Sequence, residues 1–254
     1  MITIDLSGKV ALVTGATGQL GRIMARTLAK AGADVAVHYL QNEAKAGELC
    51  AQIQAMGVRA LAVQANVADY DSVCAMRDAV IKNLGAPDIL VSNAVSQYRW
   101  TTILEQDIRD FQDQFDTCVL QNVHMAKALL PGMMAKGWGR LIGINTECSA
   151  LCNSGSGAYA SAKRGMDGIY RVLAKEVGDS GVTVNQIAPG WIISDRDRET
   201  GTEINPEYSA KVPMKRRGTD QEIADAVLFF ASELSSFITG VYLPVSGGTV
   251  MPGI

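Results

Sequence analysis

The sequence has little charge, few histidines and no long apolar run. Charged residues make up 19% of the 254 residues, against 48% hydrophobic ones, and the net charge is −3. Such a composition is typical of a folded globule. Without a long basic run, nucleic acid and anionic membrane surfaces are not expected partners. No apolar stretch reaches the roughly 18 residues of a membrane helix. The first residues lack signal-peptide features, so we expect a cytoplasmic protein.

Cysteine and histidine are too few and too scattered for a metal site. The odd number of cysteines predicts reduced thiols. Cys148 and Cys152 are close enough to suggest a metal site, but the two histidines, His38 and His124, lie far from them in sequence. We therefore expect no bound metal. The five cysteines are Cys50, Cys74, Cys118, Cys148 and Cys152.

Short apolar runs alternate with longer helical patterns along the whole chain. The runs predict strands within 10–15, 34–39, 59–67, 88–94, 139–145, 182–190 and 241–248. The helical patterns cover 20–32, 43–57, 71–85, 103–134, 157–177 and 222–233. This alternation predicts an α/β fold, a doubly wound Rossmann-type parallel sheet of about seven strands flanked by helices. We expect residues 1–254 to form a single dinucleotide-binding and catalytic domain.

Residues 191–218 differ in composition from the rest of the chain, because they contain a charged "DRDRE" run and two prolines. The segment follows a strand, and ligands bind at the carboxyl ends of strands in such sheets. It is therefore either a substrate lid over the crevice or a solvated loop. Arg196 and Arg198 could meet an anionic substrate, although alternating charges are more often a solvated face.

The run "VTGATGQLG" follows the first strand and opens the first helix. Gly15, Gly18 and Gly21 are three residues apart. A strand, a glycine turn and a helix N-terminus together present backbone N–H groups to a diphosphate. The alternative is a tight turn whose glycines serve packing. The βαβ setting favours nucleotide binding.

The end of the second strand bears on the choice between NADP and NAD. NAD-preferring proteins often place a carboxylate there, whereas this chain has His38 and Tyr39. The lack of a carboxylate favours NADP, and the lack of an arginine leaves NAD open. His38 is either a phosphate ligand or a packed histidine.

Several motifs together, in order, resemble the short-chain dehydrogenase/reductase family over essentially the whole chain. They are "TGATGQLG", "DILVSNA", "GRLIGIN", "YASAK", "VNQIAPGWIISD", "RRGTDQEIADAVLFFASELSSFITG" and "LPVSGG". The chain looks most like the branch that includes 3-oxoacyl-carrier-protein reductases. The resemblance implies hydride transfer between NAD(P)H and a small-molecule carbonyl or secondary alcohol. Enoyl-reducing relatives have six residues between tyrosine and lysine, and this chain has three.

The resemblance also implies residue roles. Tyr159 would be the catalytic acid/base, Lys163 would lower its pKa and hold the nicotinamide ribose, and Thr146 would orient the carbonyl. Contacts to the cofactor are expected from Gly15, Thr17, Gly18, Gln19, Leu20, Gly21, His38, Tyr39, Asn66, Val67, Asn93, Ala94, Tyr159, Lys163, Pro189, Gly190, Ile192 and Ser194. The family further implies a homotetramer, or a dimer, with helices 103–134 and 157–177 at the interface.

The spacing of Tyr159 and Lys163 also predicts an electrostatic interaction, independently of the resemblance. Residues i and i+4 lie on one face of a helix. An ammonium about 4 Å from the phenol, at an effective dielectric near 20, favours the phenolate by roughly 4 kcal/mol, or about three pKa units. Burial opposes this shift. We expect a net pKa closer to neutrality, where a tyrosine can exchange a proton with a carbonyl oxygen.

The sequence departs from the family at four places. Gln19 replaces the middle glycine of the loop, Val95 replaces a glycine after "SNA", and Asn66 stands where an aspartate usually meets adenine. Cys118 falls where the family has a catalytic asparagine that holds a proton-relay water, and Asn122 lies one helical turn away. A buried cysteine is a weak hydrogen-bonding group. An alternative reading is therefore a dinucleotide-binding protein with weak or no catalysis.

Overall fold

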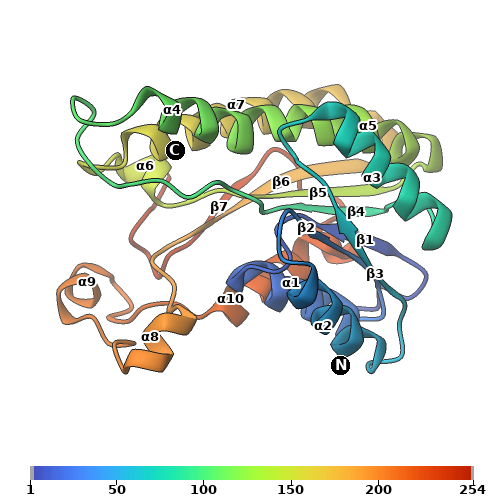
Figure 1. The fold of residues 1–254 in the computed structure, drawn as a ribbon, viewed down its shortest axis with the longest axis horizontal. Coiled ribbons are helices and arrows are strands. Elements are labelled where there is room, and N and C mark those ends of the chain that lie inside the picture. The colour runs from blue at the N-terminus through green and yellow to red at the C-terminus, as the bar shows by residue number, and fades with distance from the viewer. Residues whose placement is uncertain (1–2, 253–254) are drawn as a thin grey trace.

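The computed structural model describes residues 3–252, whose seven strands form one parallel sheet in the order β3-β2-β1-β4-β5-β6-β7 (Figure 1). The strands are β1 (Val10–Val13), β2 (Asp34–Tyr39), β3 (Ala60–Gln64), β4 (Ile89–Ser92), β5 (Gly139–Ile144), β6 (Val182–Pro189) and β7 (Tyr242–Val245). The central strands β1, β4, β5 and β6 are buried along their whole length, as expected for a sheet covered on both faces. The doubly wound fold is confirmed, and the strand order reverses between β1 and β4.

Helices cover both faces of the sheet (Figure 1). One layer is α1 (Gln19–Lys30), α2 (Glu43–Gln54) and α10 (Asp220–Ala231). The other layer is α3 (Tyr70–Asn83), α4 (Ile108–Phe115), α5 (Gln121–Lys136) and α7 (Gly157–Glu176). A separate apolar core lies under each layer. Short helices α6 (Cys148–Leu151), α8 (Asp195–Thr200) and α9 (Pro206–Lys211) lie in the loops that follow β5 and β6.

The prediction of a single helix over 103–134 is wrong, because the helical part begins later and is divided in two. Asp107 caps α4 by accepting a hydrogen bond from the Arg109 N–H at 2.9 Å, so the helix begins at Ile108. A π-helical turn, Asp116–Leu120, separates α4 from α5. Such turns often mark functional sites. A π-helical turn adds one residue to a helix and leaves the apolar pattern on either side nearly unchanged. The sequence therefore predicts one continuous helix.

The segment 191–218 contains α8 and α9, and three charges of its "DRDRE" run are paired. Asp195 binds Arg22 of α1 at 2.5 Å, and Asp197 binds Arg217 at 2.7 Å. Arg198 binds Asp220 at 2.8 Å. Arg198 is therefore engaged by carboxylates and not free for an anion, whereas Arg196 and Glu199 are exposed. The paired charges fix the segment to the body of the molecule beyond the carboxyl ends of the strands (Figure 1).

Within residues 3–252, no helix combines the length and apolarity needed to cross a membrane.

Candidate active site

The glycine loop between β1 and α1 has the shape of a phosphate cradle. Gly15 has a φ of +61°, and a Cβ there would lie 3.0 Å from the Ala94 backbone. A Cβ on Gly21 would lie 2.2 Å from the Gly15 carbonyl oxygen. Gly18 occupies the cap position of α1 without a side chain to fill it. The first N–H groups of α1 are therefore open to an anion, with the helix dipole in support.

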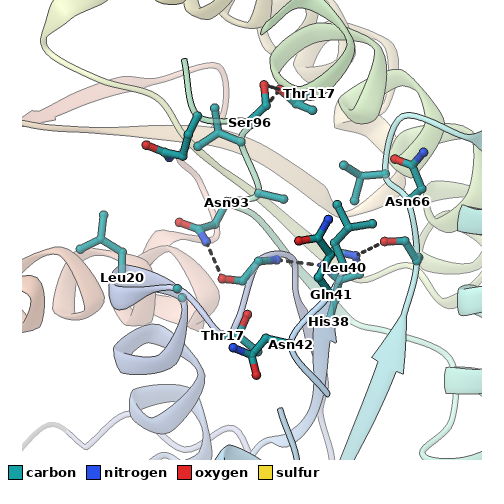
Figure 2. Close-up of a pocket in the computed structure, with 18 of the residues that line it drawn as sticks. Thr17, Leu20, His38, Leu40, Gln41, Asn42, Asn66, Asn93, Ser96 and Thr117 are labelled. Atoms are coloured by element: carbon teal, nitrogen blue, oxygen red, sulfur yellow. Dashed lines mark hydrogen bonds between the residues drawn. The ribbon is translucent and has the colours of Figure 1, made fainter. Parts of the chain in front are cut away.

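Buried side chains hold this loop in place (Figure 2). His38 Nδ1 accepts a hydrogen bond from the Gly15 N–H at 2.9 Å, and its Nε2 lies 3.0 Å from the Ala65 carbonyl. Burial lowers the pKa of His38, which keeps it neutral. The Asn93 amide donates to the carbonyls of Thr14 and Gly15. Of the two readings of His38, this geometry favours the packed histidine, because both ring nitrogens are engaged within the protein.

A cavity of about 550 Å³ opens over the loop. Asn66, Ser96 and Thr117 line it on the side away from α1, and Asn93 lies beside the glycine loop (Figure 2). Tyr39 does not line this cavity and packs in the core. The residues after β2 that line it are Leu40, Gln41 and Asn42, which the sequence reading missed. Predicted cofactor residues in the lining are Gly15, Thr17, Gly18, Gln19, Leu20, Gly21, His38, Asn66, Val67, Asn93 and Ala94.

A second cavity of about 710 Å³ lies over the ends of β5 and β6 and contains the predicted catalytic residues. Tyr159, Lys163 and Thr146 all line it, together with Pro189 and Ile192. The two cavities share Gln19, Leu20, Asn93 and Val95. One crevice therefore runs from the glycine loop to the tyrosine and lysine.

The tyrosine and lysine meet on one face of α7, as their spacing predicts. Lys163 Nζ lies 5.7 Å from the centre of the Tyr159 ring. It donates a hydrogen bond to the Ile144 carbonyl at 2.5 Å, at the end of β5. Lys163 is 3% exposed. The amine is thus fixed beside the phenol and screened from water.

Burial dominates the acid–base properties of this pair. It raises the pKa of Tyr159 above its ordinary value of 10.0, while Cys118 and Cys148 add to the rise and a hydrogen bond from Thr146 opposes it. It also lowers the pKa of Lys163. The expected shift of Tyr159 toward neutrality is therefore wrong for the protein alone. The amine of Lys163 donates its hydrogen bond to the Ile144 carbonyl. The cost of burying a phenolate at Tyr159 outweighs the attraction between that phenolate and the lysine.

Thr146 is held by its neighbours on both sides. The Asn145 side chain accepts from the Thr146 N–H at 2.8 Å, and donates to the Lys163 carbonyl at 3.0 Å and to Gln186 Oε1 at 2.7 Å. Tyr242 donates to the Thr146 carbonyl at 2.7 Å. The Thr146 hydroxyl accepts from the Cys148 N–H at 3.2 Å, and its own proton is the one directed at Tyr159. Asn145, which the sequence reading missed, therefore ties Thr146 to the lysine's helix.

Cys118 lies in the π-helical turn and is fully buried. Its Sγ is 3.7 Å from Gln114 Oε1, a weak contact. Asn122 cannot take its place, since it donates to the Cys118 carbonyl at 2.7 Å and accepts from the Tyr170 hydroxyl at 2.9 Å. Burial raises the pKa of the Cys118 thiol. The position predicted for the relay asparagine therefore holds a weakly hydrogen-bonding group.

The loop after β6 closes the second cavity. Pro189, Gly190 and Ile192 line it, but Ser194 does not: its hydroxyl caps α8 by accepting from the Asp197 N–H at 3.1 Å. Gln19 reaches across the crevice and donates to the Ile193 carbonyl at 2.6 Å. The residue that replaces the family's glycine therefore links the glycine loop to the segment that follows β6.

Aromatic side chains form part of the wall. Trp100 and Trp191 line the second cavity. The ring centres of Tyr98 and Trp100 are 6.2 and 6.1 Å from that of Tyr159. Trp191 packs edge-on against Tyr208 of α9 at 5.3 Å. The catalytic tyrosine candidate thus lies in a largely apolar setting.

The fold and crevice fit a dinucleotide-binding protein, and comparisons with known proteins identify its class as an oxidoreductase. Residues 15–250 match a family model described as enoyl-(acyl carrier protein) reductase. The chain is 35% identical over 243 residues to the 3-oxoacyl-(acyl-carrier-protein) reductase FabG of Staphylococcus aureus, covering 96% of this chain and 98% of that protein.

Solved structures give the same result. An NAD+-bound xylitol dehydrogenase has a TM-score of 0.89 and 27% identity, covering 95% of this chain and 99% of that one. A 7α-hydroxysteroid dehydrogenase in complex with NADH and 7-oxo glycochenodeoxycholic acid has a TM-score of 0.87 and 32% identity, covering 97% and 96%.

The chain belongs to the short-chain dehydrogenase/reductase family and is similar to its 3-oxoacyl-carrier-protein reductases. It is an NAD(P)-dependent enzyme of that family. The residues present fit a dinucleotide, because Gly15 and Gly21 hold the loop in a shape that a Cβ would disrupt and α1 leaves its N-terminus uncapped.

Proposed function

We propose that the chain transfers hydride between NAD(P)H and a carbonyl or secondary alcohol, with Tyr159 as acid/base and Lys163 and Thr146 as its partners. The observation that carries this proposal is the single crevice. Tyr159, Lys163 and Thr146 line one end of it, and the glycine loop lines the other. The spacing of three residues between tyrosine and lysine favours carbonyl over enoyl reduction.

The protein supplies position and protons, and the bound nicotinamide supplies the hydride. Thr146 donates a hydrogen bond to the substrate oxygen, on which negative charge develops. Tyr159 gives that oxygen its proton, or takes one in the reverse direction. Its raised pKa keeps the phenol protonated, which suits the acid role in reduction. Lys163 stays beside the phenol through its bond to the Ile144 carbonyl.

We propose NADP as the preferred form of the cofactor. Leu40, Gln41 and Asn42 line the crevice after β2, and none carries a carboxylate that would repel a 2′-phosphate. NAD remains the alternative, because these residues provide no cation either. Comparing the affinities for NADPH and NADH by thermal shift decides between them.

A second candidate function is dinucleotide binding with weak or no catalysis. Cys118 favours it, since the thiol has a raised pKa and Asn122 is engaged elsewhere. Oxidation of NADPH or NADH against a panel of ketones separates the two candidates. Stoichiometric binding without turnover on any of them would favour the second.

Replacing Tyr159 by phenylalanine tests the proposed chemistry. Tyr159→Phe keeps the ring and removes the proton, so we expect kcat to fall by at least about a hundredfold. Cofactor affinity, measured by fluorescence titration, should change little. Unchanged turnover would exclude Tyr159 as the acid/base.

We also propose that the chain assembles as a homotetramer, with a dimer as the alternative. Ile108 on α4, Phe115 at its end, Leu120 in the π-helical turn and Val172 on α7 are exposed apolar side chains. Light scattering coupled to size-exclusion chromatography measures the assembly directly.

A further inference from the structure

Glu147 is a buried acid on the wall of the substrate cavity that the proposed chemistry does not use. It follows Thr146 directly and is 6% exposed. One carboxyl oxygen, Oε1, accepts a hydrogen bond from the Tyr208 hydroxyl at 2.9 Å. The other, Oε2, is buried and has no hydrogen-bond partner among residues 3–252. Buried acceptors are nearly always paired in native proteins, so an unpaired one calls for a partner from outside the chain.

The residue that lies next to this carboxyl has no side chain. Gly190 lines the same cavity, and a Cβ there would lie 3.1 Å from Glu147 Oε2 and 2.9 Å from the Tyr208 hydroxyl. Any other residue at 190 would therefore cover the pair. Tyr208 is itself held in place, because its hydroxyl accepts from the Trp191 N–H at 2.8 Å. The pair belongs to the cavity wall and not to the core.

We propose that Glu147, supported by Tyr208, is a binding subsite for a hydroxyl group on the substrate, close to the reacting carbonyl. Glu147 lines the same cavity as Thr146, the neighbour that would contact the carbonyl oxygen. The proposal rests on the proposed function and narrows the substrate class to hydroxylated ketones and polyols.

A hydroxyl fits the subsite better than an ammonium or an acyl chain does. An ammonium would have to be desolvated in a cavity that Lys163, itself a buried amine, already lines. A hydroxyl can donate to the carboxylate or accept from the protonated acid, so it suits either state of Glu147. An apolar chain would leave Oε2 unpaired. Trp100 and Trp191 complete the wall and would pack against the carbon skeleton of a polyol.

Acetone and hydroxyacetone, reduced with NADPH, test the subsite because they differ by one hydroxyl. Glu147→Leu should lower kcat/KM for hydroxyacetone by about ten- to a hundredfold and leave that for acetone nearly unchanged. Glu147→Gln keeps an acceptor and should retain part of the preference. The matched control is Glu207→Leu, which removes an exposed carboxylate next to Tyr208 in sequence and should not change either rate.

Equal losses for both ketones in Glu147→Leu, or no loss for either, would overturn the subsite. Saturation-transfer NMR of the same two compounds gives a readout that needs no turnover. A hydroxyacetone signal that disappears in Glu147→Leu supports the subsite even if no hydride is transferred, in which case only the proposed function fails. Equal hydroxyacetone signals in the wild type and the variant would overturn the subsite whatever the activity.

Discussion

At the scale of single residues, Cys118 stands where the family resemblance predicts an asparagine. Its thiol is buried in the π-helical turn. A negative charge on its sulfur would raise the pKa of both Tyr159 and Lys163. A neutral thiol cannot hold a relay water as an amide does, because it is a weak donor and acceptor. Turnover in this chain should therefore be limited by proton delivery to the lysine.

We expect Cys118→Asn to raise kcat several-fold in the direction of carbonyl reduction, because an amide can hold the relay water. Steady-state rates and a solvent deuterium isotope effect check this, and the isotope effect should decrease as proton transfer becomes faster. Cys74→Asn on α3 is the control and should change neither quantity. No gain from Cys118→Asn would mean that another group already carries the proton.

Glu147 gives a prediction about stability and pH. Burial raises the pKa of its carboxyl above the ordinary value of 4.5, against the opposing effects of Tyr208 and the Trp191 N–H. A group whose pKa is higher in the folded state contributes full stability below its unfolded pKa, and this contribution is lost as pH rises through the folded pKa.

Relative to the wild type, Glu147→Gln should therefore gain unfolding free energy as pH rises from 4.5 through the raised pKa. The gain is about 1.36 kcal/mol for each pH unit by which the pKa of Glu147 in the folded protein exceeds its pKa in the unfolded chain. Urea unfolding at a series of pH values measures it. A difference between the two proteins that stays constant with pH would show that Glu147 ionises normally.

At the scale of elements, the catalytic geometry depends on a polar link between β5, β6 and α7. The Asn145 side chain bonds the Thr146 N–H, the Lys163 carbonyl and the Gln186 side chain. Gln186 continues to Asp167 of α7 at 2.9 Å. Because Asn145 and Gln186 are buried, their bonds restrain the position of the strand ends against the helix.

Removing this link should affect catalysis more than binding. Asn145→Ala should lower kcat by about ten- to a hundredfold, since small misplacements of reacting groups are costly. Cofactor affinity should stay close to that of the wild type. Asn83→Ala, on the exposed side of α3, is the control. A lower melting temperature with unchanged kcat would show that Asn145 serves only stability.

The sequence could predict the elements where apolar periodicity decides them. All seven strands lie within the predicted ranges, and α7 spans Gly157–Glu176 against the predicted 157–177. The π-helical turn and the late start of α4 escaped prediction, because they depend on one inserted residue and one capping aspartate. In the site, spacing placed Tyr159 and Lys163 on one helix face, and the family resemblance pointed to Thr146; all three line the second cavity. Glu147 and Tyr208 could not be predicted, since residues 61 positions apart are brought together only by the folded segment after β6.

At the scale of the whole molecule, the crevice lies where the order of the strands in the sheet reverses. The first cavity spans the ends of β1 and β4, between which the strand order reverses, and the second continues over β5 and β6. Gln19 joins the glycine loop to the segment after β6 by its bond to the Ile193 carbonyl. A ligand that fills the crevice thus contacts both halves of the sheet and should stabilise the fold as a whole.

Binding of NADPH should therefore raise the melting temperature. At a concentration of about 100 times Kd, the added stability is about 2.7 kcal/mol. For a chain of this size, that corresponds to about 5–10 °C. Differential scanning fluorimetry measures the shift.

Gly18→Asp tests whether the shift in melting temperature comes from binding of the nucleotide at the glycine loop. Gly18 has an extended backbone at the cap of α1, and its Cβ would meet only the Gly15 carbonyl, at 3.3 Å. Aspartate is a favourable cap there, so the variant should be at least as stable as the wild type without ligand. Its carboxylate would repel a diphosphate at the open N–H groups, so the shift with NADPH should disappear. An equal shift in both proteins would place the diphosphate away from the glycine loop.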